Sequence, residues 1–308
     1  MDLCLYTDSV PELSFESALD LAARIGCSSI EIAGGGQSSA PHLRLAELLG
    51  DRRKRIAFTD AFATRGLRIA ALNCSAWPLH PVNGPAHEAI IRDTIRLAGE
   101  LGVETVVSMS GTPGDGAGAS TVDWVFYPWP ADAVSLQARQ WEVAIPFWQE
   151  MAAHATANGV NHIAFELHPL HLVFNVPTLL RMREAVGPVI GANMDPSHLF
   201  WQQMDPLAAI AALGPAVQHV HLKDTGLQVD HLALAGVLDT TPFEDARDRA
   251  WVFRTVGRVH DQAWWSSFIA ALRAAGYDGP LSIENEDPYQ SPVEGVEEAA
   301  AFILPLIT

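Results

Sequence analysis

The stretch 217–224, VQHVHLKD, places an ionisable side chain at every second position of an apolar run. A β-strand turns alternate side chains to opposite faces, so His219, His221 and Lys223 share one face of a strand predicted at 217–223. Burying three polar groups on one face costs several kcal/mol each unless other groups pair with them. We therefore expect this strand to lead into a polar site.

The chain on both sides of this strand repeats an apolar strand followed by a helical pattern. Phe15, Leu19 and Ala22, for example, have the i, i+4, i+7 spacing of a helix that packs one face inward. The predicted strands lie at 3–7, 29–33, 68–74, 105–110, 162–168, 189–195, 217–223 and 281–286. Alternating strands and helices indicate parallel strands, and eight such units predict an α/β fold, a single (β/α)₈ TIM barrel formed by residues 1–308.

Two intervals between strands are longer than one strand–helix unit. Residues 111–139 follow the fourth predicted strand, and residues 224–259 follow the seventh. Insertions after barrel strands lie at the C-terminal face, where the active sites of this fold are built. We therefore expect both insertions to border a functional site.

The composition limits the classes of partner. The chain carries a formal net charge of −17 and has no basic stripe of the kind that binds nucleic acid. No segment resembles a signal peptide or a membrane span, and Cys4, Cys27 and Cys74 lack paired spacing. We therefore expect a cytoplasmic protein with reduced thiols that binds neither nucleic acid nor a membrane.

The last four predicted strands end in side chains that can bind a divalent cation. In chain order these are Glu166, Asp195, His221 and Glu284. The C-terminal ends of neighbouring barrel strands converge, so three carboxylates would repel one another there unless a cation lies between them. Although a single strand-end glutamate more often forms a salt bridge, four such residues on successive strands predict a metal site.

The motifs around these residues resemble the sugar phosphate isomerase/epimerase family, whose barrel is that of xylose isomerase. They are FELHP, NMDPSHLFW, HVHLKDT and GYDGPLSIENEDP, and the resemblance covers almost the whole chain. It implies one divalent ion, with Mn²⁺ expected first and Mg²⁺, Co²⁺ or Zn²⁺ as alternatives, held by Glu166, Asp195, His221 and Glu284. It also implies that His198 binds substrate.

The predicted metal site indicates a reaction class. A divalent ion polarises the carbonyl of a bound sugar and favours loss of a proton from the neighbouring carbon, so we predict proton abstraction from a keto sugar. In ketose 3-epimerases of this fold the two metal-binding glutamates move the proton, which implies Glu166 and Glu284 here. Those epimerases carry a further glutamate and an arginine where this chain has Leu172 and Leu227, which weakens a ketose-epimerase assignment.

His168 is a candidate base. It stands two residues after Glu166 on the same strand face, and an imidazole suits proton transfer near neutral pH. The Glu-x-His arrangement resembles barrel enzymes that act on 3-oxo-glycosides, removing the proton beside the ketone and expelling the C1 substituent by β-elimination. We predict catalysis by His168; the alternative is that it only orients a ligand carboxylate.

Other side chains are candidates for contact with a small carbohydrate substrate. Lys223 lies one step nearer the barrel mouth than His221. The first insertion contains DWVFYPWP, whose rings, Trp129 included, suit stacking on a sugar or a flat aglycone, and the second insertion offers Arg258. A subunit contact explains the aromatic cluster nearly as well, and we expect a homo-oligomer.

Two alternative functions stay open at this point. An endonuclease IV-like phosphodiesterase shares the barrel, but it needs a basic groove and further ligands for three metal ions. A catalytic subunit that needs a small accessory chain is the other alternative, because some 3-oxo-glycoside lyases of this type work with one. The sequence does not decide between isomerisation, epimerisation and elimination.

Overall fold

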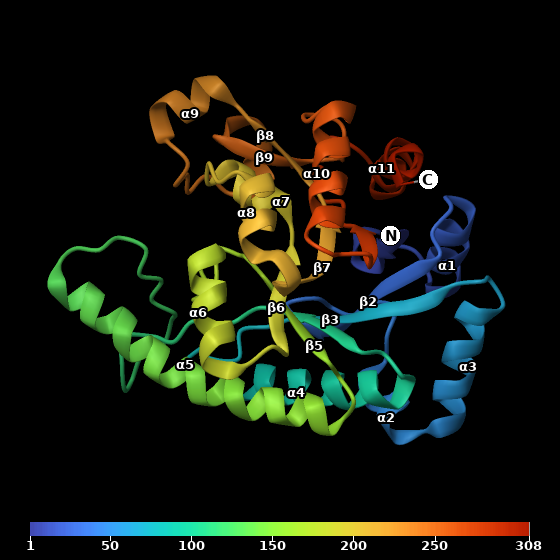
Figure 1. Cartoon of the computed structure of the whole chain (residues 1–308), viewed down its shortest axis with the longest axis horizontal. Coiled ribbons are helices and arrows are strands. Elements are labelled where there is room, and N and C mark those ends of the chain that lie inside the picture. The colour runs from blue at the N-terminus through green and yellow to red at the C-terminus, as the bar shows by residue number, and fades with distance from the viewer. Residues whose placement is uncertain (308) are drawn as a thin grey trace.

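A closed barrel of eight parallel strands forms the centre of the molecule (Figure 1). The computed structural model describes residues 1–307. The barrel strands are β1 (Asp2–Tyr6), β2 (Ser29–Gly36), β3 (Arg68–Ser75), β4 (Thr105–Ser108), β5 (His162–Glu166), β6 (Ile190–Met194), β7 (Val217–Leu222) and β10 (Pro280–Ile283). They follow one another around the barrel in chain order, and β10 closes it by pairing with β1. The predicted (β/α)₈ TIM barrel is confirmed.

Each predicted strand overlaps one barrel strand, and the largest differences, three residues each, are at the ends of β2 and β10. β10 ends at Ile283, whereas the sequence pattern predicts a strand to 286. Beyond Ile283 the backbone N–H of Asn285 donates to Oγ of Ser9, 3.0 Å away, instead of to a neighbouring strand. Glu284 therefore lies at the point where the chain leaves the sheet.

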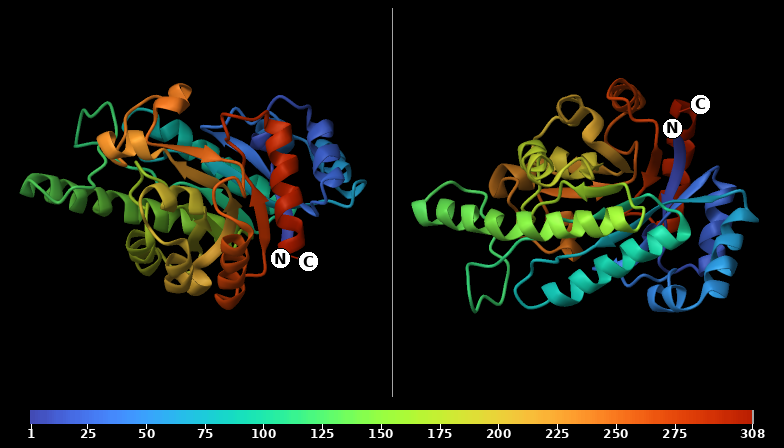
Figure 2. Two further views of the ribbon diagram at one scale, coloured as in Figure 1. Left: turned by 90° about the horizontal axis from the view of Figure 1, so that it is seen from above. Right: turned by 60° about the horizontal axis from the view of Figure 1, so that its bottom comes forward.

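Helices cover the outside of the barrel. In α1, Ala18, Leu19 and Ala22 are buried, and the Ser14 hydroxyl caps the helix by accepting from the N–H of Ser17. The helices are α1 (Phe15–Arg24), α2 (Leu45–Gly50), α3 (Arg52–Ala63), α4 (Gly84–Leu101), α5 (Ala131–Ala157), α6 (Val176–Val186), α7 (Pro196–Trp201), α8 (Pro206–Leu213), α9 (Val229–Ala235), α10 (Gln262–Ala274) and α11 (Pro292–Ile307). The N-terminal part of α5 extends past the barrel (Figure 2).

The strands separate an apolar layer from a more polar barrel interior. Val220 and Leu222 of β7 belong to the apolar core between strands and helices. His219 and His221 alternate with them, are buried, and point to the other face. The side-chain alternation predicted for this strand therefore places both imidazoles inside the barrel.

The segments after β4 and β7 stand at the same end of the barrel as the strand termini. Residues 109–130 contain no helix or strand, and α5 begins within the predicted first insertion. After β7 the chain forms an antiparallel pair, β8 (Asp224–Leu227) with β9 (Trp251–Arg254), which is visible beside α9 in Figure 1. The sequence pattern does not predict this pair.

The cysteines and the helices bear on the environment expected for the chain. The thiols of Cys4, Cys27 and Cys74 are free and buried. Within residues 1–307, no helix has both the length and the apolar character needed to cross a membrane.

Candidate active site

Three of the predicted cation ligands lie together at the C-terminal ends of β6, β7 and β10. Asp195, His221 and Glu284 each offer one ligand atom, and these atoms lie within 4.8 Å of one another. The three side chains are nearly inaccessible, with 1%, 0% and 13% of their surfaces exposed. Strands that are neighbours in the barrel thus bring together residues far apart in the chain.

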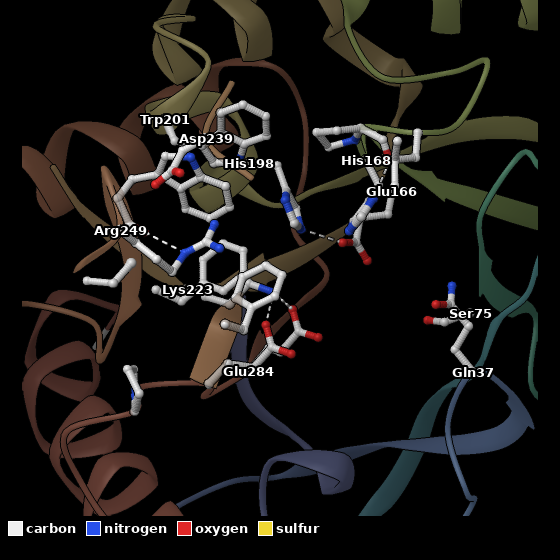
Figure 3. A pocket seen from close by; sticks show the side chains of 18 of the residues that line it. Gln37, Ser75, Glu166, His168, His198, Trp201, Lys223, Asp239, Arg249 and Glu284 are labelled. Atoms are coloured by element: carbon white, nitrogen blue, oxygen red, sulfur yellow. Dashed lines mark hydrogen bonds and ion pairs between the residues drawn. The ribbon is translucent and has the colours of Figure 1, made fainter. Parts of the chain in front are cut away.

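A second cluster lies beside the first and contains Glu166, His168 and His198. One ligand atom from each lies within 4.8 Å of the others. Nε2 of His198 is 2.8 Å from Oε1 of Glu166, and the rings of His168 and His198 are 4.3 Å apart. Figure 3 shows this cluster facing the same space as Glu284. The fourth predicted ligand, Glu166, therefore lies with the two histidines and is not part of the close group formed by Asp195, His221 and Glu284.

Lys223 supplies positive charge to the carboxylates. Its Nζ lies 2.6 Å from Oε2 of Glu284, 2.9 Å from Oε2 of Glu286 and 3.2 Å from Oδ2 of Asp195. Burial alone would lower the pKa of this ammonium, but the surrounding carboxylates hold it well above its usual value. Lys223 is therefore a charged member of the site.

Glu31 of β2 forms the floor of the site. Its carboxylate accepts hydrogen bonds from His219 Nε2, Ser282 Oγ and Asn73 Nδ2, each 2.7 Å away, and from His221 Nε2, 3.0 Å away. Burial alone would raise its pKa, but the imidazoles of His221 and His219 hold the pKa well below the usual value. The strand-end pattern does not include Glu31, although a glutamate inside the apolar run SIEIA was a usable signal.

The hydrogen bonding of His168 defines which nitrogen is free. Nδ1 lies 2.6 Å from the carbonyl oxygen of Pro169, so Nδ1 carries the proton and donates it there. Nε2 is left with its lone pair. Burial, and then repulsion from His198, lowers the pKa of His168 to about 4, so the ring is neutral at neutral pH.

The pKa of Glu166 is raised, whereas that of His168 is lowered. Burial, followed by repulsion from Glu284, raises its pKa to about 7. Burial also lowers the pKa of His198 to about 4. The protein alone therefore keeps little net charge in this cluster, because neither imidazole is protonated at neutral pH and the carboxyl is only partly ionised.

A cavity of about 1230 Å³ opens above the site, and its wall includes Glu166, His168, His198, Lys223 and Glu284. All five were candidates from the sequence. The aromatic side chains that the first insertion contributes to the wall are Trp124 and Phe126.

Two predicted substrate contacts are not brought to this cavity. Trp129 is 73% exposed and is absent from the cavity wall. Arg258 pairs with Glu298 at 2.6 Å on the surface and is also absent from the wall. Side-chain type made both residues candidates, but the path of each insertion turns them elsewhere.

Residues 19–306 match a family model described as a xylose isomerase-like TIM barrel. The chain belongs to this family. The protein YfiH of Bacillus subtilis, described as uncharacterized, is 42% identical over 300 residues, which cover 96% of each chain.

Solved structures share the xylose isomerase-like barrel over its full length. A probable 3-DHS dehydratase, AsbF of Bacillus anthracis, is 15% identical with a TM-score of 0.70, and the match covers 99% of both chains. The IolI protein with a bound zinc atom is 18% identical with a TM-score of 0.68, covering 100% of this chain and 98% of that one. A D-allulose 3-epimerase from Methylomonas sp. is 17% identical with a TM-score of 0.63, covering 99% and 98%. These likenesses show the fold.

The residues of this xylose isomerase-like barrel fit a divalent ion. Oδ1 of Asp195 accepts from the N–H of Ser197, 2.8 Å away, whereas Oδ2 is buried, has no hydrogen bond within the described residues and faces the ammonium of Lys223 at 3.2 Å. Nδ1 of His221 faces Glu284, and its Nε2 faces Glu31. A carboxylate behind a ligand histidine is the usual arrangement that fixes the imidazole for metal binding.

Proposed function

We propose that this chain is a divalent-metal-dependent enzyme that removes the proton next to the ketone of a keto sugar. The observation that carries the proposal is the place of His168. Its unprotonated Nε2 stands in a cluster with Glu166 and His198, in the wall of the cavity and beside the group of cation-binding side chains. A proton acceptor and a site for an electrophile therefore face one space.

The cation-binding side chains suit Mn²⁺, with Mg²⁺, Co²⁺ or Zn²⁺ as alternatives. Asp195, His221 and Glu284 would hold it, together with Glu166, since oxygen ligands with one imidazole match these ions. When bound, such an ion polarises the ketone oxygen and stabilises negative charge on it. Glu31 would hold the Nε2–H of His221, so that Nδ1, now 3.0 Å from Oε2 of Glu284, could turn its lone pair to the ion.

His168 would accept the proton from the carbon beside the ketone. Its Nδ1–H is already bonded to the carbonyl of Pro169, so the ring cannot turn without losing that contact. The buried surroundings keep the ring neutral before the reaction. Lys223, which is buried beside Glu284, would place a positive charge close to the oxygen atoms of a sugar bound there.

Elimination from a 3-oxo-glycoside is the outcome that His168 suits best. His168 takes the proton at C2, the C–H electron pair becomes the C1–C2 double bond, and the bond to the C1 substituent breaks. That bonding pair leaves with the substituent, which then takes up a proton. In an epimerase the same carbon would instead receive a proton back. Proteins described as a dehydratase and as an epimerase both have this fold, so the fold is compatible with either outcome.

The substrate experiment separates these outcomes. The purified protein is loaded with Mn²⁺ and given a 3-oxo-glucoside, and in a separate reaction free ketoses in deuterated water. Release of the aglycone supports elimination, while deuterium incorporation without release supports isomerisation or epimerisation. If neither occurs with Mn²⁺, Mg²⁺, Co²⁺ or Zn²⁺, the proposal is wrong.

Two variants test the assigned roles. Glu284→Gln should lose the metal, measured by elemental analysis after gel filtration, because a neutral amide replaces a ligand carboxylate. His168→Ala should keep the metal but lose turnover by about 10²–10⁴-fold, the usual contribution of a general base. Glu12→Gln, on an exposed side chain, is the control for both measurements. Full turnover by His168→Ala would remove the histidine from the mechanism.

A further inference from the structure

The cavity extends well beyond the groups that are proposed to do the chemistry. Its volume of about 1230 Å³ is larger than the roughly 300–1,000 Å³ typical of pockets that bind drug-sized ligands. A single sugar ring leaves much of this space empty. The side chains that line the remaining space indicate what else could bind there.

The catalytic groups lie between two different ends of the cavity. Figure 3 shows Gln37 and Ser75 on one side, and Trp201 with Arg249 on the opposite side, while Glu284 lies between them. A ligand that reaches both ends must therefore pass the catalytic groups. The two ends differ in chemistry.

The first end is polar and comes from the ends of β2 and β3. Gly36 has a φ of +92°, and a Cβ at this position would lie 2.5 Å from the carbonyl oxygen of Ser75. Glycine is therefore required for β2 to stay against β3 at the barrel mouth. The next residue, Gln37, donates its backbone N–H to that same carbonyl at 2.7 Å, which places an amide side chain beside a hydroxyl. Such groups suit the hydroxyls of a sugar.

The opposite end is aromatic and comes from α7 and β9. The rings of Trp201 and Trp251 stack with centroids 4.6 Å apart and an angle of 4° between their planes. Phe253 lies 5.3 Å from Trp251, and Phe243 stacks on Phe253 at 6.1 Å. Trp251, Phe253 and Phe243 all belong to the predicted insertion 224–259. The insertion thus adds an aromatic wall to the barrel.

This aromatic wall reaches the catalytic groups directly. The ring of Phe253 lies 4.6 Å from Nζ of Lys223 and 5.3 Å from the ring of His198. A flat group that contacts this wall would therefore be attached to the sugar itself, without a long linker.

The guanidinium of one arginine, Arg249, holds the aromatic wall in place. The guanidinium of Arg249 lies 4.1 Å from the ring centre of Phe243 and 4.5 Å from that of Trp251. It also donates to the carbonyls of Thr241 and Trp251. A wall that is ordered before the ligand arrives loses less conformational entropy on binding.

The wall also contains a donor without a partner. Nε1 of Trp201 is buried and makes no hydrogen bond with any residue that the structure describes, although Trp201 is only 5% exposed and lines the cavity. Because this nitrogen is closed off from the cavity, a ligand there would contact the indole ring of Trp201 and not its N–H.

We infer that the aromatic end of the cavity binds an aromatic group attached to the sugar, and that the substrate is an aryl glycoside. This inference rests on the proposed function, because it places the sugar ring at the catalytic groups. It adds that the leaving group is flat and largely apolar. The insertion after β7 is then the part of the chain that selects the substrate.

Binding of unreactive glycosides tests this inference. Phenyl and methyl β-glucoside lack the ketone, and their affinities for the purified full chain are measured by calorimetry. We expect phenyl glucoside to bind about tenfold more tightly, as contact with an aromatic wall contributes on that scale. Trp251→Leu and Phe243→Ala should bring the two affinities within about twofold of each other. Tyr127→Ala, on an aromatic side chain that is exposed and outside the cavity wall, should keep the difference.

Each outcome has a defined meaning. Equal affinities for the two glucosides, or a preference that survives both Phe243→Ala and Trp251→Leu, would overturn the inference. Should Trp251→Leu fail to fold by circular dichroism, Phe243→Ala decides, because Phe243 is 60% exposed and tolerates truncation better. If phenyl glucoside binds more tightly than methyl glucoside but no 3-oxo-glycoside is turned over, the proposed function is wrong. Turnover of free keto sugars without a phenyl preference would overturn only the aryl inference.

Discussion

Both carboxylate oxygens of Glu31 lie 3.0 Å from Nε2 of His221. The two residues are 190 positions apart in the chain, on strands β2 and β7. Because a carboxylate accepts, Nε2 of His221 carries a proton and donates it to Glu31. Nδ1 of His221 then faces Asp195 and Glu284. Glu31 therefore acts on the candidate metal site through another residue, as a positioning residue.

Replacing Glu31 by glutamine should weaken binding of the metal. The amide keeps the shape of the side chain but removes the charge that orients His221, and such changes behind a metal ligand typically cost about 10–100-fold in affinity. The affinity is measured by competition with a chelator, using Mn²⁺. Glu12→Gln, which is exposed, is the matched control. An unchanged affinity in a folded Glu31→Gln protein would show that His221 needs no such support.

Replacing Lys223 by methionine should make the protein depend on a divalent cation for stability. Without the ammonium, Asp195, Glu284 and Glu286 lose their common counter-charge, and breaking such a buried pairing costs about 3–5 kcal/mol. We expect the melting temperature in chelator to fall, and the increase on adding Mn²⁺ to be larger than in the unmodified protein. Lys54 is the only other lysine and forms an exposed pair with Glu47, so Lys54→Met is the control and should change neither quantity. Equal effects of the two substitutions would contradict the assigned role of Lys223.

The stability of the protein should depend on pH through His171. This side chain is fully buried and its Nδ1 accepts the N–H of Gly111 at 3.1 Å. Burial, followed by repulsion from His168 and His198, holds the pKa of His171 well below its usual value. As pH falls below about 6.5, the unfolded chain takes up a proton at this residue that the folded chain does not, so stability is lost on acidification.

His171→Gln should remove that part of the pH dependence. Between about pH 6.5 and pH 5 the free energy of unfolding of the unmodified protein should fall by about 1 kcal/mol per pH unit relative to the variant. Urea unfolding of metal-free protein measures both values. A difference between the two proteins that stays constant over this range would show that His171 does not titrate as described.

The three cysteines should be inert in the folded protein. Burial raises the pKa of Cys27 and of Cys74 to about 12, and holds that of Cys4 well above the usual value. The thiolate is the reactive form, so a thiol reagent at about pH 8 should label none of them until guanidinium unfolds the chain. Ser39→Cys, at an exposed position, supplies a positive control. Rapid labelling of a native thiol would mean that the segment around it opens.

The alternation of side chains in single strands was enough to predict the barrel and much of the site. Period-two spacing identified His221 and Lys223, and the strand-end positions of Asp195 and Glu284 placed them beside it. These side chains lie close together because parallel strands in a closed barrel end at one rim, so a strand end in the sequence is also a position in space.

The insertions were predicted less well, because no comparable rule relates a position in a long loop to a position in space. Arg258 and Trp129 have suitable side chains, yet they lie outside the cavity wall. Trp251 and Phe253 line it because β9 pairs with β8, which depends on contacts between residues distant in the chain. Glu31 was missed for the same reason, since its partners come from three other strands.

The amino-acid sequence by itself determined the strand–helix repeat and the acidic and histidine residues at the strand ends, because local periodicity and strand parity express these features directly. Only the tertiary structure decided that Glu31 supports His221, that Lys223 lies among the carboxylates, and that an aromatic wall stands beside them. Those relationships arise from side chains that meet across the closed barrel and its folded insertion, and distances of that kind are not encoded in the spacing of any one segment.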